Sequence, residues 1–163
     1  MPSPADVGAV APDFTLPSTQ GPITLSERLR KRAVLLVFYP GDDTPVCTRQ
    51  LCDYRDHLAD FEGLGVDVLA LNPQPLASHE RFARKHGLSF PLLSDSDSSV
   101  CRSYGAVGLL GMTKRALVLI GRDGRIRWRH TDLPIFRRSA EELRTKITDL
   151  RLDDPASAAR SEP

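Results

Sequence analysis

The chain has 163 residues, with 22 Lys plus Arg against 21 Asp plus Glu and a formal net charge of +1. This length fits one domain, and a chain of this size buries roughly 70% of the surface exposed by its unfolded form, so its core needs no disulfide support. The balanced charge lacks the basic surplus typical of nucleic-acid or anionic-membrane binders, and we expect neither partner. The odd count of three cysteines fits a reducing compartment, where thiols serve reactivity or packing.

The amino-terminal segment, MPSPADVGAVAPDF, has neither the basic nor the apolar region of a signal peptide. No apolar run approaches the ~18 residues that a membrane helix requires. We therefore expect a cytoplasmic protein. A single domain is predicted over residues 1–152, followed by a polar, alanine-rich tail over residues 153–163 that we expect to be flexible.

The first third of the chain predicts a β-rich leader and a central strand. Turn residues surround two short apolar stretches, 14–16 and 23–25, which predict a hairpin. The basic run at 28–32 is predicted to be a solvated turn. Residues 33–39 (AVLLVFY) are continuously apolar, which is typical of a strand that is covered on both faces.

A turn follows this strand and leads into a predicted helix. Thr44 can cap the helix, and Pro45 can occupy its first position. Apolar residues then recur at spacings of three and four up to about residue 61, which predicts one buried stripe. Gly63 and Gly65 are expected to end the helix.

The second half of the chain continues the alternation of strands and helices. The predicted strands are 66–71, 90–93, 114–120 and 125–130, and the predicted helices are 78–86, 98–104 and 139–150. Ser78 is expected to cap the first of these helices, and Ser139 with Glu142 forms a capping box for the last. The alternating polarity of 125–130 predicts one solvated side. This order predicts an α/β, thioredoxin-like fold with an amino-terminal β-hairpin extension and a central, mostly parallel sheet flanked by helices.

Cys47 stands where such a fold places its chemistry. Open α/β sheets bind ligands beyond the carboxyl ends of their strands, and Cys47 lies in the first turn of the helix that follows strand 33–39. Unpaired backbone N–H groups and the helix dipole favour an anion there, which favours the thiolate over the thiol. Free cysteines are more often small buried hydrophobes, but this position favours a nucleophile.

Cys52 lies five residues after Cys47, and helix geometry limits what the two thiols can do together. In an intact helix, two Cα atoms at this spacing are about 8.6 Å apart, whereas a disulfide needs less than about 7 Å. The Cα atoms of a Cys-x-x-Cys pair are only about 5 Å apart, so a helix can close that disulfide. A Cys47–Cys52 disulfide therefore requires the first helical turns to unwind. The spacing disfavours a simple dithiol reductase.

The segment around Cys47 resembles the active-site signature of peroxiredoxins. Its core, Pro-x-x-x-Thr/Ser-x-x-Cys, is met by Pro40, Thr44 and Cys47. The spacing to Cys52 and the Asp-x-Thr-Pro-x-Cys-Thr context most resemble the bacterioferritin-comigratory, or Q, branch of that family. The resemblance extends from near the amino terminus to the last predicted helix. It places Arg115 in a segment similar to the strand that carries the family's active-site arginine.

The resemblance implies a thiol-dependent peroxidase that reduces hydrogen peroxide and organic hydroperoxides. It implies that Cys47 attacks the peroxide and becomes a sulfenic acid. Thr44 is implied to orient the peroxide, Arg115 to hold the thiolate and stabilise the leaving oxygen, and Pro40 to shield the pocket. Cys52 is implied to form an intramolecular disulfide with Cys47. Thioredoxin or a similar thiol donor is the reductant that the resemblance implies.

The remaining cysteine and the histidines indicate no second site. Cys101 is expected to pack in the core. The four histidines lack the spacing of metal ligands, so we expect neither a metal nor another cofactor. The protein is expected to be a monomer or a weak dimer. Two alternative functions stay open: a thioredoxin-like disulfide reductase, and a non-enzymatic redox-sensing module that uses Cys47 only as a switch.

Overall fold

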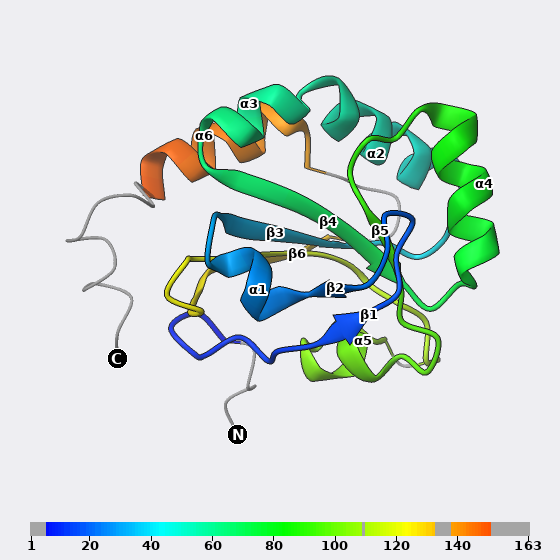
Figure 1. Cartoon of the computed structure of the whole chain (residues 1–163), viewed down its shortest axis with the longest axis horizontal. Coiled ribbons are helices and arrows are strands. Elements are labelled where there is room, and N and C mark those ends of the chain that lie inside the picture. Colours follow the sequence, from blue (N-terminus) through cyan, green and yellow to red (C-terminus); the bar gives the residue numbers. More distant parts are fainter. Residues whose placement is uncertain (1–5, 109, 133–137, 151–163) are drawn as a thin grey trace.

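The computed structural model of the chain describes residues 6–108, 110–132 and 138–150 (Figure 1). Its elements in chain order are β1 (Thr15–Leu16), β2 (Ile23–Thr24), α1 (Leu25–Leu29), β3 (Ala33–Phe38), α2 (Pro45–Asp56), α3 (Leu58–Gly63), β4 (Val66–Asn72), α4 (Leu76–His86), β5 (Leu92–Ser94), α5 (Ser99–Ser103), β6 (Arg115–Ile120), β7 (Ile126–Asp132) and α6 (Ala140–Leu150). The predicted tail, 153–163, lies outside the described residues, and so does part of the predicted domain 1–152.

Five strands form the central sheet in the order β5-β4-β3-β6-β7, and β1 pairs with β2 in a separate hairpin. The β3–β4 and β4–β5 pairings are parallel, whereas β3–β6 and β6–β7 are antiparallel. The predicted α/β, thioredoxin-like arrangement is confirmed. The sheet was predicted to be mostly parallel, and that detail is wrong: two of its four pairings are antiparallel, because the late hairpin β6–β7 joins the central strand β3.

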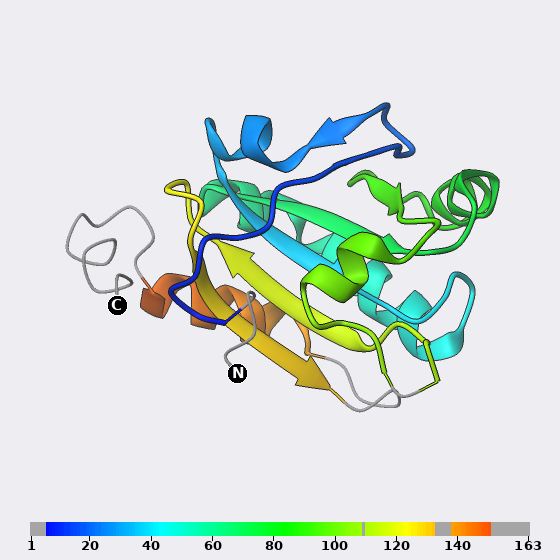
Figure 2. The ribbon, with the colours of Figure 1, turned by 90° about the horizontal axis from the view of Figure 1, so that it is seen from below.

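Helices and the leading hairpin cover the two faces of this sheet. Helices α2, α3, α4 and α6 lie over one face, and α1, α5 and the β1–β2 hairpin lie over the other (Figures 1 and 2). Alternate side chains of β3 point into these two layers, as the period of two in a strand requires. Leu35, Val37 and the following Tyr39 belong to the helical layer, together with Cys47. Phe38 belongs to the opposite layer.

The helix predicted to reach residue 61 is two helices. The structure ends α2 at Asp56 and begins α3 at Leu58. His57 lies between them, where its ring Nδ1 contacts the Asp53 carbonyl oxygen at 2.9 Å. That carbonyl is the ordinary i−4 acceptor for the backbone N–H of His57, which instead donates to Tyr54 at 3.2 Å. A side-chain contact within one turn thus interrupts the helix.

Two further local predictions are wrong in part, and each has a packing reason. Arg30 and Lys31 form an exposed turn as predicted, but residues 28–29 belong to α1 because Leu25 and Leu29, four residues apart, are both buried. In β7, Arg127 is 8% exposed instead of lying on a solvated side. Its guanidinium reaches the partly exposed carboxylate of Asp123 at 3.2 Å, so an ion pair at the surface covers Arg127 on the face that was predicted to be solvated.

Of the capping predictions for α6 and α4, the first is confirmed and the second is wrong. The backbone N–H of Glu142 donates to the Ser139 hydroxyl at 3.2 Å, as in the predicted capping box at the start of α6. Ser78, however, does not cap α4, which begins at Leu76 with Pro75 at the N-cap position. The Ser78 hydroxyl instead donates to Asp42. Within the described ranges, none of the helices has the length and apolar character needed to span a membrane.

Candidate active site

Cys47 lies in the first turn of α2, buried against the carboxyl end of β3. The residue is 0% exposed. Its Sγ accepts a hydrogen bond from Nη2 of Arg115 at 2.9 Å. The structure therefore brings together the predicted nucleophile and the predicted arginine, and it buries both. The guanidinium is thus the group placed to stabilise negative charge that develops at the sulfur during a reaction.

Sheet register explains how Arg115 reaches Cys47 from 68 residues away in the sequence. Arg115 is the first residue of β6, and its neighbour Ala116 pairs with Phe38, the last residue of β3. The carboxyl end of β3 and the amino end of β6 therefore meet beside the first turn of α2. Only an antiparallel β3–β6 pairing aligns these two ends.

Gln50 is a site residue that sequence reasoning missed. It is fully buried on α2, one turn after Cys47, and its side-chain oxygen accepts a hydrogen bond from Nη1 of Arg115. Its amide nitrogen donates to the Tyr54 hydroxyl at 3.1 Å, and that hydroxyl donates to the carbonyl of Arg138 at 2.7 Å. The two terminal nitrogens of the Arg115 guanidinium thus each bind a residue of α2, and the two residues are one turn apart. A polar residue within the apolar stripe of α2 was the available signal.

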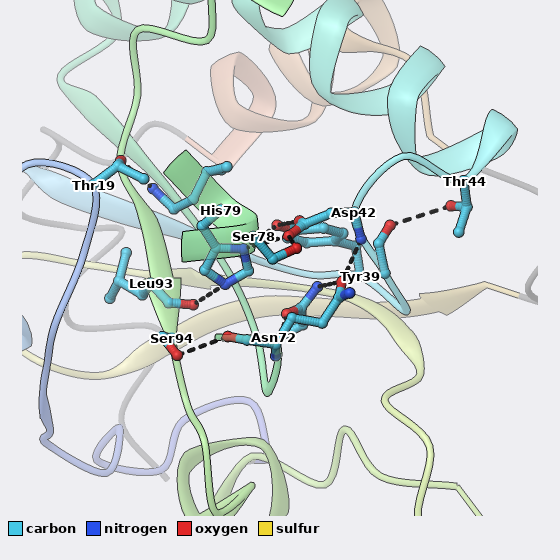
Figure 3. Close-up of polar contacts among 12 residues, drawn as sticks. Thr19, Tyr39, Asp42, Thr44, Asn72, Ser78, His79, Leu93 and Ser94 are labelled. Carbon is cyan, nitrogen blue, oxygen red and sulfur yellow. Dashed lines mark hydrogen bonds and ion pairs between the residues drawn. The ribbon is translucent and has the colours of Figure 1, made fainter. Parts of the chain in front are cut away.

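The loop between β3 and α2, residues 40–44, carries the other residues of the predicted motif. Pro40 is half-buried and immediately precedes this loop's turn, and Thr44 occupies the N-cap position of α2 with extended backbone angles. The Thr44 hydroxyl donates to the carbonyl of Gly41 at 3.2 Å instead of capping the helix (Figure 3). Thr44 is an exposed residue three positions before Cys47, and its hydroxyl oxygen can still accept a hydrogen bond from a bound ligand.

Asp42, in the same loop, gathers three hydrogen-bond donors. Tyr39 donates to its Oδ1 at 2.6 Å, and Oδ2 contacts the Ser78 hydroxyl at 2.6 Å and Nδ1 of His79 at 2.8 Å (Figure 3). Burial pushes the pKa of Asp42 upward, but the bonds from His79, Ser78 and Tyr39 outweigh burial and hold that pKa below its usual value. Burial, followed by the charge of Asp42, raises the pKa of Tyr39, which stays a donor.

This lowered pKa predicts a pH-dependent contribution to stability. An ordinary Asp titrates near about pH 3.9, so the contribution of Asp42 is complete above that pH and is lost as the pH falls through the lower folded-state value. We expect Asp42→Asn to reduce the free energy of unfolding at pH 7 by about 1–3 kcal/mol. The difference from wild type should narrow below pH ~4.

Urea unfolding at neutral and acid pH measures this difference. Asp43→Asn is the matched control, because Asp43 is adjacent, exposed and paired with Lys85 on the surface. Exposed pairs contribute little, so the control should change stability much less than Asp42→Asn at both pH values. A difference between wild type and Asp42→Asn that stays constant or widens on acidification would contradict the prediction.

The other two cysteines lie in different surroundings. Cys52 is half-buried on α2, which runs unbroken through both Cys47 and Cys52, and all three cysteines are free thiols. Cys101 lies in the core layer on the opposite face of the sheet from Cys47. Burial, assisted by the neighbouring Asp95, strongly raises the pKa of the Cys101 thiol. Cys101 is therefore far from the site and is unreactive at neutral pH.

The described residues contain no cluster of three His, Cys, Asp or Glu side chains that could hold a metal ion. A buried cysteine at a helix amino terminus, bonded to a buried arginine within a thioredoxin-like fold, defines a thiol-based oxidoreductase. The model of the AhpC/TSA family matches residues 7–129. The chain belongs to this family, the peroxiredoxins, and it is a thiol-dependent peroxidase.

Similar proteins agree with this assignment. A bcp-type peroxiredoxin of Coxiella burnetii is 41% identical over 102 residues, which are 63% of this chain and 68% of that protein. The chloroplastic peroxiredoxin Q of Triticum aestivum is 38% identical over 98 residues, 60% of this chain and 45% of that protein. The structure of the reduced 2-Cys peroxiredoxin of Plasmodium vivax has a TM-score of 0.82 at 26% identity, covering 87% of this chain and 80% of that one. The resemblance to the bcp and Q branch is thus confirmed.

Proposed function

We propose that this peroxidase reduces hydrogen peroxide and organic hydroperoxides through Cys47. The 2.9 Å bond between Nη2 of Arg115 and Sγ of Cys47 carries the proposal. A thiolate attacks the terminal peroxide oxygen, an S–O bond forms and the O–O bond breaks. The sulfur becomes a sulfenic acid, and the other oxygen takes up a proton and leaves as water or an alcohol.

Arg115 and Thr44 have distinct roles in this step. Negative charge moves from the sulfur to the leaving oxygen, and the guanidinium already beside the sulfur stabilises that charge without rearranging. The Thr44 hydroxyl, whose hydrogen is donated to Gly41, can accept a hydrogen bond from the incoming hydroperoxide and align its O–O bond with the sulfur. Pro40, at the start of the same loop, has no N–H group that would compete for the peroxide.

We propose that Cys52 resolves the sulfenic acid. Its sulfur attacks the Cys47 sulfur, an S–S bond forms, and the sulfenic oxygen leaves as water. Because α2 is intact through both residues, its first turns must unwind for this bond to form. The later part of α2 is anchored: Asp53 accepts the backbone N–H of Ala140 at 2.7 Å, and Arg55 donates to the carbonyl of His86. The turns that carry Cys47 are therefore expected to open.

Peptide mapping tests the resolving role. After one equivalent of hydrogen peroxide, we expect the wild-type protein to contain a peptide pair joined by a Cys47–Cys52 disulfide. In Cys52→Ser, the sulfenic acid at Cys47 should persist and be trapped by dimedone, and catalytic turnover with thioredoxin should fall by about tenfold or more, because an unresolved sulfenic acid is open to further oxidation. A Cys47–Cys101 disulfide or an intermolecular one in the wild type would contradict this role.

Thioredoxin or a similar thiol carrier is the proposed reductant. The basis is family membership, since the disulfide must be reduced before the next cycle and the remaining cysteine, Cys101, is buried on the other face of the sheet. We further propose a cytoplasmic location, supported by the odd cysteine count, and a monomer or weak dimer. Insulin reduction without peroxide separates this function from a dithiol reductase, for which the Cys47–Cys52 spacing is unfavourable.

A further inference from the structure

A buried ion pair lies beside the reacting groups and takes no part in the proposed chemistry. Asp42 and His79 approach within 2.8 Å, and their side chains are 4% and 0% exposed. Replacing a buried ion pair by apolar residues of similar volume is often neutral or stabilising. The pair is therefore weak evidence for fold stability alone. The position of Asp42 in loop 40–44, next to the helix that carries Cys47, points to a role in the site.

Hydrogen-bond partners fix the charge of the pair. Nε2 of His79 lies 3.0 Å from the carbonyl oxygen of Leu93, which can only accept, so Nε2 carries a hydrogen (Figure 3). Nδ1 faces Oδ2 of Asp42, which already accepts from the Ser78 hydroxyl. One proton therefore lies between Nδ1 and Oδ2, and the pair is neutral overall. Without that proton, two lone pairs would face each other at 2.8 Å.

The pair joins the peroxide-binding loop to its surroundings. Asp42 is in the middle of loop 40–44, whereas His79 is on α4 and is itself bonded to β5. The backbone N–H of Asp42 also donates to the side-chain oxygen of Gln74. The next carbonyl toward the amino terminus, that of Gly41, accepts the Thr44 hydroxyl. A displacement of Asp42 would thus move the backbone that sets Thr44.

The same pair is linked to Cys47 through Tyr39. Tyr39 and Cys47 lie in one core layer. The Tyr39 hydroxyl donates to Asp42 at 2.6 Å, and the charge of Cys47 is among the causes that raise the pKa of Tyr39. Tyr39 therefore lies within the electrostatic reach of both Asp42 and Cys47. An uncompensated negative charge on Asp42 would oppose the thiolate through this shared neighbour.

We propose that the Asp42–His79 pair is a positioning element of the peroxide-reducing step, which holds loop 40–44 against α4 while leaving no net charge beside Cys47. This inference rests on the proposed roles of Cys47 and Thr44. The proposed role has two parts. The hydrogen bonds of the pair hold loop 40–44 in place, and the proton on the imidazole balances the charge of the Asp42 carboxylate.

Other charged and titratable groups surround the pair on several elements. They are Tyr39 after β3, Cys47 on α2 acting through Tyr39, and a cluster of the exposed Asp43 and Lys85 with the half-buried His86. Ser78 on α4, Gln74 in the loop after β4 and the Leu93 carbonyl of β5 contribute neutral groups. Among the described residues named above, His79 is therefore the buried basic side chain in direct contact with Asp42, and its replacement should be felt at Cys47.

The test measures kcat/KM for hydrogen peroxide as a function of pH. His79→Asn keeps a donor toward Asp42 but carries no titratable proton. We expect kcat/KM to fall about tenfold at neutral pH, with the acid limb of the profile moved upward by about one pH unit. Adding Asp42→Asn removes the unbalanced carboxylate, so the double variant should return the acid limb to its wild-type position and recover part of kcat/KM.

Lys85→Ala is the matched control, because it removes an exposed ion pair to the same loop from the same helix. Its profile should stay within twofold of wild type. If His79→Asn does not fold, His79→Gln, which keeps a donor toward Leu93, takes its place. A folded His79 variant with an unmoved acid limb, or an acid limb that Asp42→Asn does not restore, would overturn the inference. A wild-type protein unable to turn over peroxide would instead overturn the proposed function.

Discussion

Replacing Cys47 by Ser is expected to lower peroxide consumption by on the order of 10⁴-fold or more, because the variant loses the atom that takes up the peroxide oxygen. A serine hydroxyl at this place does not ionise at neutral pH, so the charge of Arg115 cannot activate it. Peroxide loss in the presence of thioredoxin, thioredoxin reductase and NADPH is the appropriate measurement.

Cys101→Ser is the matched control for this experiment. Cys101 is buried on the other side of the sheet, and its thiol stays protonated at neutral pH because burial and Asp95 raise its pKa. The control should keep peroxide consumption within about twofold of wild type. Full activity in Cys47→Ser, or a comparable loss in Cys101→Ser, would contradict the assignment of the nucleophile.

Arg115→Lys should have the second largest effect, a loss in kcat/KM for peroxide of about 10²–10³-fold. Lysine keeps the positive charge but lacks the planar fork, so one ammonium cannot hold both Cys47 and Gln50 in the present geometry. The expected loss therefore measures positioned hydrogen bonding rather than charge alone. Arg115→Met, which removes both the charge and the fork, should lose more.

Stopped-flow measurement of the first turnover separates this effect from later steps, since Arg115 acts before the disulfide forms. Arg122→Lys serves as the control, because that exposed arginine donates to the carbonyl of Arg30, on the hairpin side of the sheet. It should leave the first turnover unchanged. A rate for Arg115→Lys within about threefold of wild type would show that the fork geometry contributes little.

The strands and the nucleophile Cys47 could be predicted from the sequence because their signals are strong and local. A continuously apolar run marked β3, and the motif that ends at Cys47 lies within one turn and the start of one helix. Arg115 was different. Nothing in its own neighbourhood distinguishes it from a solvated strand residue, and the family resemblance placed it in the site.

The side chains that support the site could not be predicted in this way. Asp42 and His79 are 37 residues apart, and their contact depends on α4 packing beside loop 40–44. Ser78 resembled a helix cap, but its hydroxyl is taken by Asp42 once the chain is folded. In both cases a tertiary contact outweighs a local preference. Gln50 was missed although its signal is local: it lies among apolar residues of α2 that predict packing, and packing alone does not indicate a bond to Arg115.

Steady-state peroxide reduction with a thioredoxin system tests the central claim most directly. The proposed cycle through Cys47 and Cys52 predicts many equivalents of peroxide consumed per protein molecule, with matching oxidation of NADPH and loss of the signal when thioredoxin is left out. Consumption of one equivalent followed by arrest, with the complete thioredoxin system present, would contradict the cycle and favour a redox-sensing module.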